Sequence, residues 1–111
     1  MSFEYPDFIR KLPEADIPFN GVKGHLMSSD NGLAIFFEID PIGQVPEHSH
    51  GAQWGIVLSG SMKLTIDGET KVFKEGDKYY IPRGVKHSAE FQTKFFAIDF
   101  FEEPDRYTAK A

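Results

Sequence analysis

Hydrophobic residues recur along this chain in short runs, which glycine, proline and Asp-Gly pairs interrupt at intervals of roughly 8–12 residues. Residues 62–66 alternate between apolar and polar side chains, as a half-buried β-strand requires, and end at Asp67-Gly68, a strong signal for a two-residue hairpin. Further strand-like runs cover residues 33–39, 54–58, 69–73, 78–81, 85–91 and 94–101. No segment after Gly21 shows helical periodicity. The pattern therefore predicts an all-β sandwich or barrel.

The two ends of the chain differ from this repeating part. Residues 1–20 contain three prolines, which prevent a long helix, and several apolar side chains that need burial. We expect them to form an N-terminal arm that packs on the barrel or on a partner subunit, with the barrel at 21–101 and a C-terminal tail at 102–111. Residues 95–101 are apolar on both faces, so we expect one face in the core and the other under the arm or a second subunit.

Composition and charge narrow the function classes. The 111 residues suffice for one domain with a modest core. The absence of cysteine excludes disulfides, thiolate metal ligands and a cysteine nucleophile. A net charge of −5 argues against nucleic acid as a partner, because phosphate contacts need clustered basic residues. No apolar stretch is long enough to cross a membrane, and residues 1–7 lack the features of a signal peptide, so we expect a cytoplasmic protein.

Three of the four histidines have spacings typical of a metal site. His48 and His50 are two residues apart, so in an extended chain their side chains project from the same face. His87 lies in the alternating run 85–91, on its apolar face. Since imidazoles are the commonest metal ligands in proteins, the pattern predicts that these three converge on a metal ion. His25 lies outside this pattern, and we expect it to be an ordinary surface or loop residue.

Two groups of residues in this region have the spacing of a known pair of motifs. The first group consists of His48, His50, Gln53 and Gly60. The second consists of Gly76, Pro82, Gly84 and His87. Residues 61–75 separate the two groups, a short separation typical of small bacterial proteins of this kind. In these features the chain resembles the cupins, small β-barrels of the double-stranded β-helix, or jelly-roll, type.

The chain departs from the usual cupin motifs at several positions. Gln53 stands where cupins usually have a glutamate, and the gap between His50 and Gln53 is one residue shorter than usual. Gly43 also precedes His48 by one residue fewer than usual, and Phe91 occupies the position of an asparagine. The glutamine matters most, because it changes the charge of the implied site.

The resemblance implies that a divalent metal is held by His48, His50, Gln53 and His87. With an amide in place of the glutamate, the site retains both charges of the ion, which makes the metal a stronger Lewis acid and favours anionic substrates. Gln53 could instead only hydrogen-bond near the metal. Nitrogen and oxygen ligands suit Zn, Fe, Ni, Mn or Cu, so the sequence does not distinguish among these transition metals.

The sequence assigns no catalytic residue beyond these ligands. Arg83 lies in the Pro-x-Gly turn and could attract a carboxylate, although a solvated turn residue is the simpler interpretation. Tyr79 or Tyr80, on opposite faces of one strand, could supply an acid or a hydrogen bond. Trp54 directly follows Gln53 and should therefore face away from it, toward another sheet or a dimer contact.

Three functions remain open. The resemblance favours a small enzyme that uses Lewis-acid, non-redox metal chemistry on a small, oxygen-rich, anionic substrate such as a sugar acid. Gln53 and residues 57–60 are similar to the pectin-degradation cupins, which open unsaturated uronate sugars. The alternatives are an Fe(II)-dependent dioxygenase with the same ligands and a non-catalytic ligand-binding or sensing cupin. We also expect a homodimer, because cupins commonly pair through their sheets and two-fold symmetry is the default for soluble oligomers.

Overall fold

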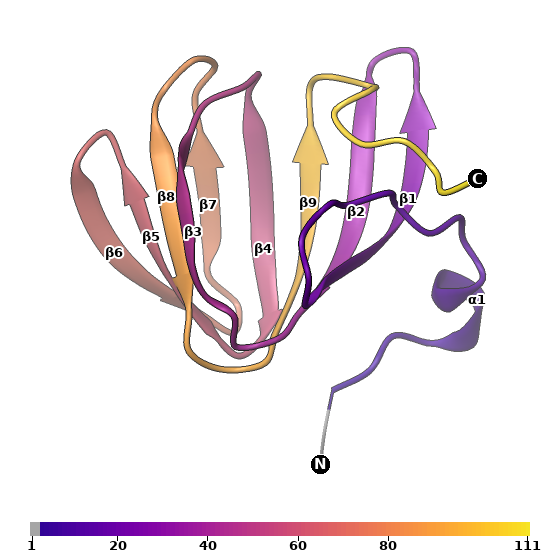
Figure 1. Ribbon diagram of the computed structural model, residues 1–111, viewed down its shortest axis with the longest axis horizontal. Coiled ribbons are helices and arrows are strands. Elements are labelled where there is room, and N and C mark those ends of the chain that lie inside the picture. Colours follow the sequence, from indigo (N-terminus) through magenta and orange to yellow (C-terminus); the bar gives the residue numbers. More distant parts are fainter. Residues whose placement is uncertain (1–2) are drawn as a thin grey trace.

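β-Strands account for most of the computed structural model, which describes residues 3–111 (Figure 1). The elements are α1 Asp7–Arg10, β1 Val22–Ser29, β2 Gly32–Ile39, β3 Gly43–His48, β4 Gln53–Ser59, β5 Ser61–Ile66, β6 Glu69–Lys74, β7 Lys78–Ile81, β8 His87–Phe91 and β9 Phe95–Phe101. The strands form a five-stranded sheet of order β1-β2-β9-β4-β7 and a four-stranded sheet of order β3-β8-β5-β6. All their pairings are antiparallel, and the predicted all-β, jelly-roll fold is confirmed.

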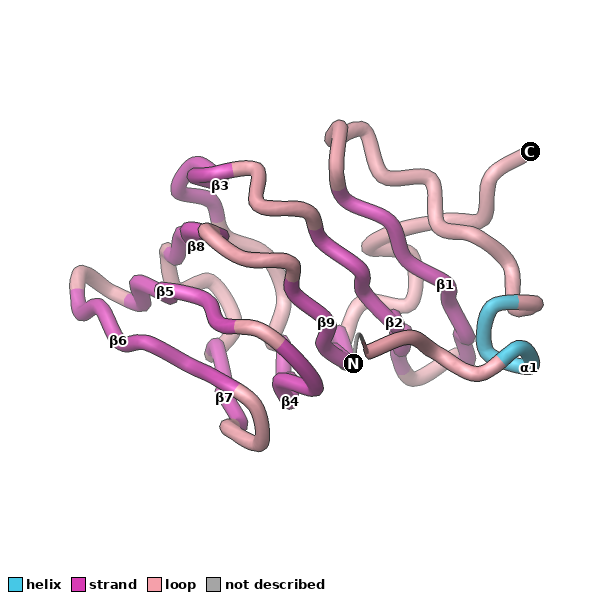
Figure 2. The backbone as a smooth tube through the Cα atoms, turned by 90° about the horizontal axis from the view of Figure 1, so that it is seen from below, coloured by secondary structure: helices cyan, strands magenta, loops and turns pink. Residues whose placement is uncertain are grey.

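The hydrophobic core lies between the inner faces of the two sheets. Its most deeply buried aliphatic and aromatic side chains, none more than 2% exposed, are Leu33, Ile35, Val57, Ile81, Phe95 and Phe101. All six come from the five-stranded sheet, because alternate residues of its strands point inward. The four-stranded sheet contributes Met62, Leu64 and Phe91. Figure 2 shows this sheet on one side of the molecule, with the five-stranded sheet extending from it toward α1.

The hairpin predicted at Asp67-Gly68 joins β5 to β6. Both residues have positive φ angles, 50° and 81°, as a type I′ turn requires. The sequence pattern did not predict β1 or the first part of β3, and both are edge strands. Edge strands tolerate polar residues and proline, so β1 contains buried side chains only near Leu26, and β3 accommodates Pro46.

Phe3 and Tyr5 of the arm pack on the outer face of the five-stranded sheet, whereas Ala15 near its other end belongs to the hydrophobic core. The first two residues of the arm lie outside the described part of the chain. Tyr5 is only 4% exposed, and its hydroxyl donates hydrogen bonds to the carbonyls of Phe37 (2.8 Å) and Ala97 (3.1 Å). The Tyr5 ring makes edge-on contacts with Phe36 and Phe96. Within residues 3–111, no helix has the length and hydropathy needed to cross a membrane.

Candidate metal centre

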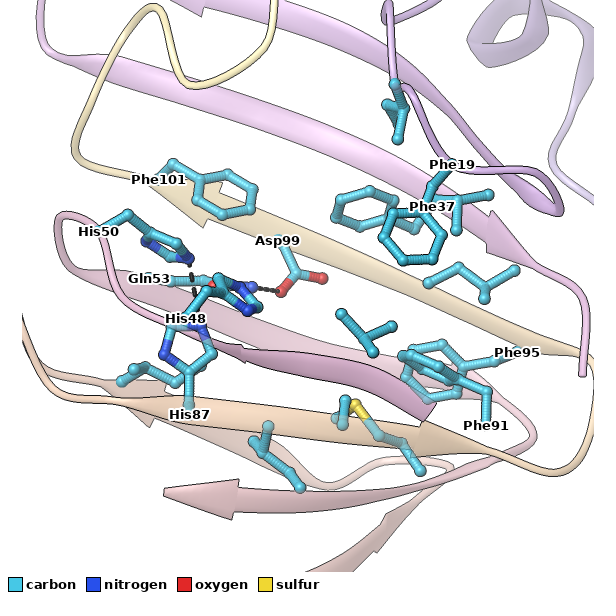
Figure 3. A pocket seen from close by; sticks show the side chains of 18 of the residues that line it. Phe19, Phe37, His48, His50, Gln53, His87, Phe91, Phe95, Asp99 and Phe101 are labelled. Carbon is cyan, nitrogen blue, oxygen red and sulfur yellow. Dashed lines mark hydrogen bonds between the residues drawn. The ribbon is translucent and has the colours of Figure 1, made fainter. Parts of the chain in front are cut away.

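A cavity of about 130 Å³ lies between the two sheets and is polar at one end only (Figure 3). Aromatic side chains, among them Phe19, Phe37, Phe91 and Phe95, line the other end. The polar end is formed by His48, His50, Gln53, His87 and Asp99, together with Arg106 from the C-terminal segment. The sheets therefore bring the predicted metal ligands into one concave site, as ligand sites usually require.

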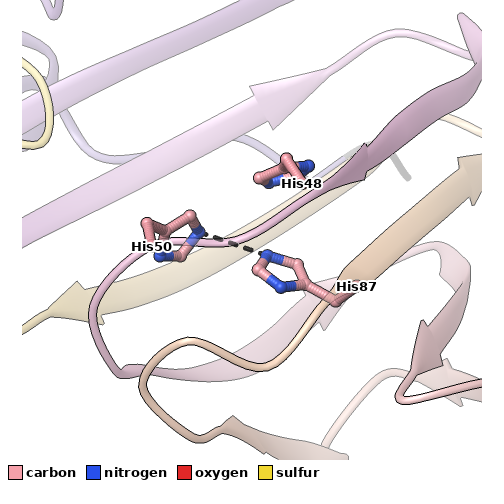
Figure 4. Close-up of side chains that lie close together, drawn as sticks. All are labelled: His48, His50 and His87. Carbon is pink, nitrogen blue, oxygen red and sulfur yellow. Dashed lines mark hydrogen bonds between the residues drawn. The ribbon is translucent and has the colours of Figure 1, made fainter.

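The three predicted histidines converge at this polar end (Figure 4). One ring nitrogen from each lies within 4.8 Å of the others. His48 at the end of β3 pairs across the sheet with His87 at the start of β8, and His50 follows in the loop after β3. The spacing that suggested a shared face therefore corresponds to three convergent imidazoles.

Backbone carbonyls orient all three imidazole rings. In each ring Nδ1 lies within hydrogen-bonding distance of a carbonyl oxygen close in the sequence. These oxygens belong to Pro46 for His48 (2.8 Å), Gly51 for His50 (2.7 Å) and Val85 for His87 (3.0 Å). Because a carbonyl can only accept, each Nδ1 donates its hydrogen, and in the neutral ring Nε2 retains a free lone pair. Such outer hydrogen bonds fix the tautomer of metal-binding histidines.

The Nε2 atoms of His50 and His87 lie only 3.2 Å apart. With both Nδ1 atoms donating to carbonyls, two neutral rings would direct two lone pairs at each other. Burial lowers the pKa of His50 and of His87, which favours these neutral rings. A cation shared between the nitrogens relieves the repulsion of the lone pairs, so the donor set fits a divalent transition metal.

Gln53 faces the same cavity from the first residue of β4. Its side-chain nitrogen donates a hydrogen bond of 2.6 Å to Asp99, so the amide oxygen is the atom that could reach a metal. The hydroxyl of Tyr79 donates to the same carboxylate, at 2.8 Å from both of its oxygens. Of the two tyrosines considered from the sequence, Tyr79 thus lies inside and supplies a hydrogen bond, whereas Tyr80 is exposed outside.

Asp99 is a site residue that sequence reasoning missed. It is 2% exposed, and burial raises its pKa to about 7 although the hydrogen bonds from Gln53 and Tyr79 oppose that rise. The available signal was a single carboxylate within the otherwise apolar run 95–101. A buried acid with a raised pKa in a cavity is characteristic of functional sites.

Arg106 was also missed, since the sequence predicted only a C-terminal tail at 102–111 and no role for its residues. Its guanidinium lies 4.8 Å from the centre of the Tyr107 ring, and both residues line the cavity. The Nε atom of Arg106 is buried and has no hydrogen-bond partner among the described residues. A buried donor without a partner is rare in proteins and indicates a place for an acceptor.

Two carboxylates from the C-terminal segment hold the loop that carries His50. Glu102 accepts hydrogen bonds from the backbone N–H of Ala52 (2.7 Å) and from Nε (2.6 Å) and Nη2 (2.8 Å) of Arg83. Glu103 accepts one from the N–H of Gly51 at 2.9 Å. Arg83 therefore lies outside the cavity and connects its own loop, which leads to His87, with the loop after His50.

Comparison with known proteins gives one family and several relatives of known structure. The Cupin domain profile matches residues 35–98. An RmlC-like cupin from Shewanella frigidimarina is 26% identical, with a TM-score of 0.75 over 96% of this chain and 93% of that one. KdgF from a Halomonas species shares the fold, with 19% identity and a TM-score of 0.71 over 82% of this chain and 87% of that one. Oxalate decarboxylase from Bacillus subtilis also shares it, with 20% identity and a TM-score of 0.72 over 87% of this chain and 29% of that one.

Stretches of this chain also match curated mannose-1-phosphate guanylyltransferases. The protein from Salmonella montevideo is 46% identical over 56 residues, which are 50% of this chain and 12% of that enzyme. One from Escherichia coli is 50% identical over 72 residues, 59% of this chain and 16% of that enzyme. The chain thus spans only a small fraction of the length of these relatives.

Proposed function

Because this chain belongs to the cupin family, we propose that it binds a divalent transition metal and acts on a small, oxygen-rich, anionic substrate, such as a sugar acid. The proposed ligands are His48, His50, His87 and the amide oxygen of Gln53. The observation that carries the proposal is the 3.2 Å approach of two Nε2 atoms whose rings are already held by backbone carbonyls. When bound, the ion would supply a Lewis acid that polarises a carbonyl or hydroxyl oxygen.

Asp99 is the candidate group for proton transfer. Its carboxyl lines the cavity beside Gln53, and its pKa of about 7 allows it to accept or release a proton near neutral pH. Efficient general acid–base groups have a pKa close to the working pH. Tyr79 orients the carboxylate by donating to both of its oxygens.

Arg106 is the residue in the cavity best suited to bind an anionic substrate. Its buried Nε donor lacks a partner, and a substrate carboxylate or phosphate in the cavity would provide one. Arginine pairs with carboxylates and phosphates in a planar, bidentate geometry that fixes orientation as well as charge. The positive charge of a site with an amide in place of a carboxylate ligand favours the same substrates.

The names of the relatives agree with this substrate class. Mannose-1-phosphate is an anionic sugar derivative, and oxalate is a small dicarboxylate. The oxalate decarboxylase of Bacillus subtilis contains Mn(II) centres. These likenesses support an oxygen-rich anion at a metal, and the sequence likeness to the pectin-degradation cupins favours a sugar acid among such anions.

Elemental analysis of the purified protein tests the metal site. The variants His48→Ala, His50→Ala and His87→Ala should each lose most of the bound metal, because each removes one converging ligand. His25→Ala is the matched control, since His25 is also a part-buried histidine with Nδ1 at a backbone carbonyl, that of Leu12, but lies outside the site. Full metal occupancy in all three site variants would exclude the proposed centre. Circular dichroism should show that each variant remains folded.

Ligand screening tests the chemistry. Sugar acids and dicarboxylates should raise the melting temperature of the metal-loaded protein, and Arg106→Gln should abolish that rise without releasing the metal. Product formation without oxygen consumption would support non-redox turnover. Oxygen consumption that depends on iron would indicate a dioxygenase instead, and binding without any product would indicate a sensing protein.

A further inference from the structure

An outer groove lies beside the cavity of the candidate metal centre. It has a volume of about 500 Å³ and is bounded by β3, the arm and the C-terminal segment. Six residues line both the cavity and the groove: Ile17, Phe19, Val45, His48, Arg106 and Tyr107. Their side chains therefore form the wall that separates the interior of the barrel from the groove. Four of the six belong to the arm and the C-terminal segment rather than to a strand.

The C-terminal segment is joined to the arm at the far end of this wall. Figure 1 shows the segment, in yellow, turning back after β9 and running toward the arm. Ala109 pairs there with Ala15 in a short antiparallel bridge. Two backbone hydrogen bonds flank this pair, from the N–H of Asp16 to the carbonyl of Thr108 (2.7 Å) and from the N–H of Lys110 to the carbonyl of Glu14 (2.9 Å). At its near end, the segment is held by the two carboxylates that bind the loop after His50.

Between these two attachments the segment has few contacts. Among the described residues, the one backbone hydrogen bond of residues 104–107 joins the N–H of Arg106 to the carbonyl of Glu103, at 3.3 Å. The ring of Tyr107 packs edge-on against Phe37 and Phe101, with 6.4 and 5.9 Å between ring centres. A segment that is fixed at its ends and has few backbone hydrogen bonds between them belongs to the part of a protein that opens locally.

We propose that residues 104–108 are a gate between the outer groove and the metal centre. When the bridge to the arm is released, the segment turns about its attachment at Glu102 and Glu103 and opens the wall at Tyr107. The groove is then the route by which a substrate enters. This inference rests on the proposed function in taking the cavity as the place where the substrate binds. Because Arg106 lies on the gate, the group suited to bind the anion moves with the segment that admits it.

Chemical modification of His87 by diethylpyrocarbonate, followed by mass spectrometry, tests the gate. His87 is 4% exposed, so the reagent reaches its ring when the site opens. Lys110→Pro removes the N–H that bonds to the carbonyl of Glu14, and modification of His87 should become at least tenfold faster. Lys110→Met is the matched control. It retains that N–H, loses only the exposed ion pair with Glu14, and should leave the rate as in the wild-type protein.

A disulfide across the bridge tests the opposite effect. Ala15 and Ala109 form a non-hydrogen-bonded pair, whose Cα atoms lie ~4.5 Å apart, a distance that a disulfide spans. The chain contains no cysteine, so the double variant Ala15→Cys, Ala109→Cys can form only this bond within one molecule. Its oxidation should slow the modification of His87 at least tenfold. Reduction, followed by removal of the reductant, should restore the wild-type rate.

Equal rates at His87 in the oxidised and reduced forms of the double variant would overturn the gate. Equal rates in Lys110→Pro and Lys110→Met would overturn it as well. Circular dichroism establishes that each variant is folded, and if Lys110→Pro is not, the disulfide decides alone. All rates are measured in the presence of a chelator, so they do not depend on metal binding. A protein that binds no metal would contradict the proposed function and leave the test of the gate intact.

Discussion

Replacing Tyr79 by phenylalanine removes one hydroxyl from the interior and weakens the support of the Asp99 carboxylate. Tyr79 is 6% exposed, and its hydroxyl lies 2.8 Å from both carboxylate oxygens. In the variant, Gln53 is left as the side-chain donor to that carboxylate among the described residues. A phenyl ring of nearly the same shape fills the same space, so the lost hydrogen bond dominates the effect.

The magnitude depends on the charge of Asp99. A hydrogen bond to a charged group contributes about 1.5–3 kcal/mol, whereas a bond between neutral groups contributes about 0.5–1.5 kcal/mol. Since the pKa of Asp99 is about 7, the carboxyl is ionised at pH 8 and protonated at pH 5. We therefore expect Tyr79→Phe to lower the free energy of unfolding by about 2 kcal/mol at pH 8 and about 1 kcal/mol at pH 5.

Proton linkage also predicts that Tyr79→Phe lowers stability more at high pH than at low pH. Burial raises the pKa of Asp99 from 3.8 to about 7, so between these values the folded state binds more protons than the unfolded state. Stability contributed by this group therefore falls as the pH rises through that window. The Tyr79 hydroxyl stabilises the ionised form and limits the rise in pKa. Its removal raises the pKa further, which extends the loss of stability to higher pH.

Urea unfolding at pH 5 and pH 8, followed by circular dichroism in the presence of a chelator, measures this effect without a contribution from metal binding. Tyr80→Phe is the control, because the neighbouring tyrosine is 57% exposed and should change stability by less than ~0.5 kcal/mol. All samples should have the same protein concentration. The reasoning would be refuted if Tyr79→Phe lowered the free energy of unfolding by less than ~0.5 kcal/mol at pH 8, or by no more at pH 8 than at pH 5.

Three further predictions concern the metal site. The Gln53→Glu variant should bind metal more tightly and prefer iron or manganese more strongly, because the substitution adds an anionic ligand. If a competition titration shows unchanged affinity and unchanged metal preference, Gln53 lies outside the coordination sphere. Glu102→Gln should weaken metal binding several-fold and change the melting temperature little, because it loosens the loop after His50. Glu69→Gln, which alters a surface ion pair, is the control. Equal metal affinities of the two variants would contradict the role of Glu102. Burial lowers the pKa of His50 and His87, so proton competition should release the metal below, not above, the usual histidine range near pH 6.5, and a pH titration of metal content measures this.

The sequence predicted most clearly the strands that have one face in the core and the other face toward solvent. Alternation identified residues 62–66, and Asp67-Gly68 identified the turn that follows, because both signals are local. The edge strand β1 was not predicted, because its exposed positions do not alternate sharply with buried ones. Local periodicity reflects burial on one face, and a strand at the margin of a sheet has less of its surface buried.

The histidines could be predicted because the spacing of His48 and His50 is local and His87 belongs to the second cupin motif, whereas the acid and the arginine could not. Asp99 is placed by the pairing of β9 with β4, where it lies opposite Gly55. A Cβ at Gly55 would lie 2.5 Å from the Tyr79 hydroxyl oxygen, so the glycine leaves the space in which tyrosine and carboxylate meet. Contacts of this kind join residues that are 20 positions apart, as for Tyr79 and Asp99, or 46 apart, as for Gln53 and Asp99, and no spacing rule along the chain reveals them.

The same difference between local and distant contacts divides the chemistry of the site. The carbonyls that orient the imidazoles belong to residues one or two positions away, at Pro46, Gly51 and Val85, so each short segment carries its own ligand together with the group that fixes its tautomer. The cavity groups suited to a proton or an anion come instead from β9 and the C-terminal segment. Changes at Asp99 or Arg106 can therefore alter which substrate binds and reacts without altering the metal ligands. This separation is a physical reason why one barrel with the same histidines can support different reactions.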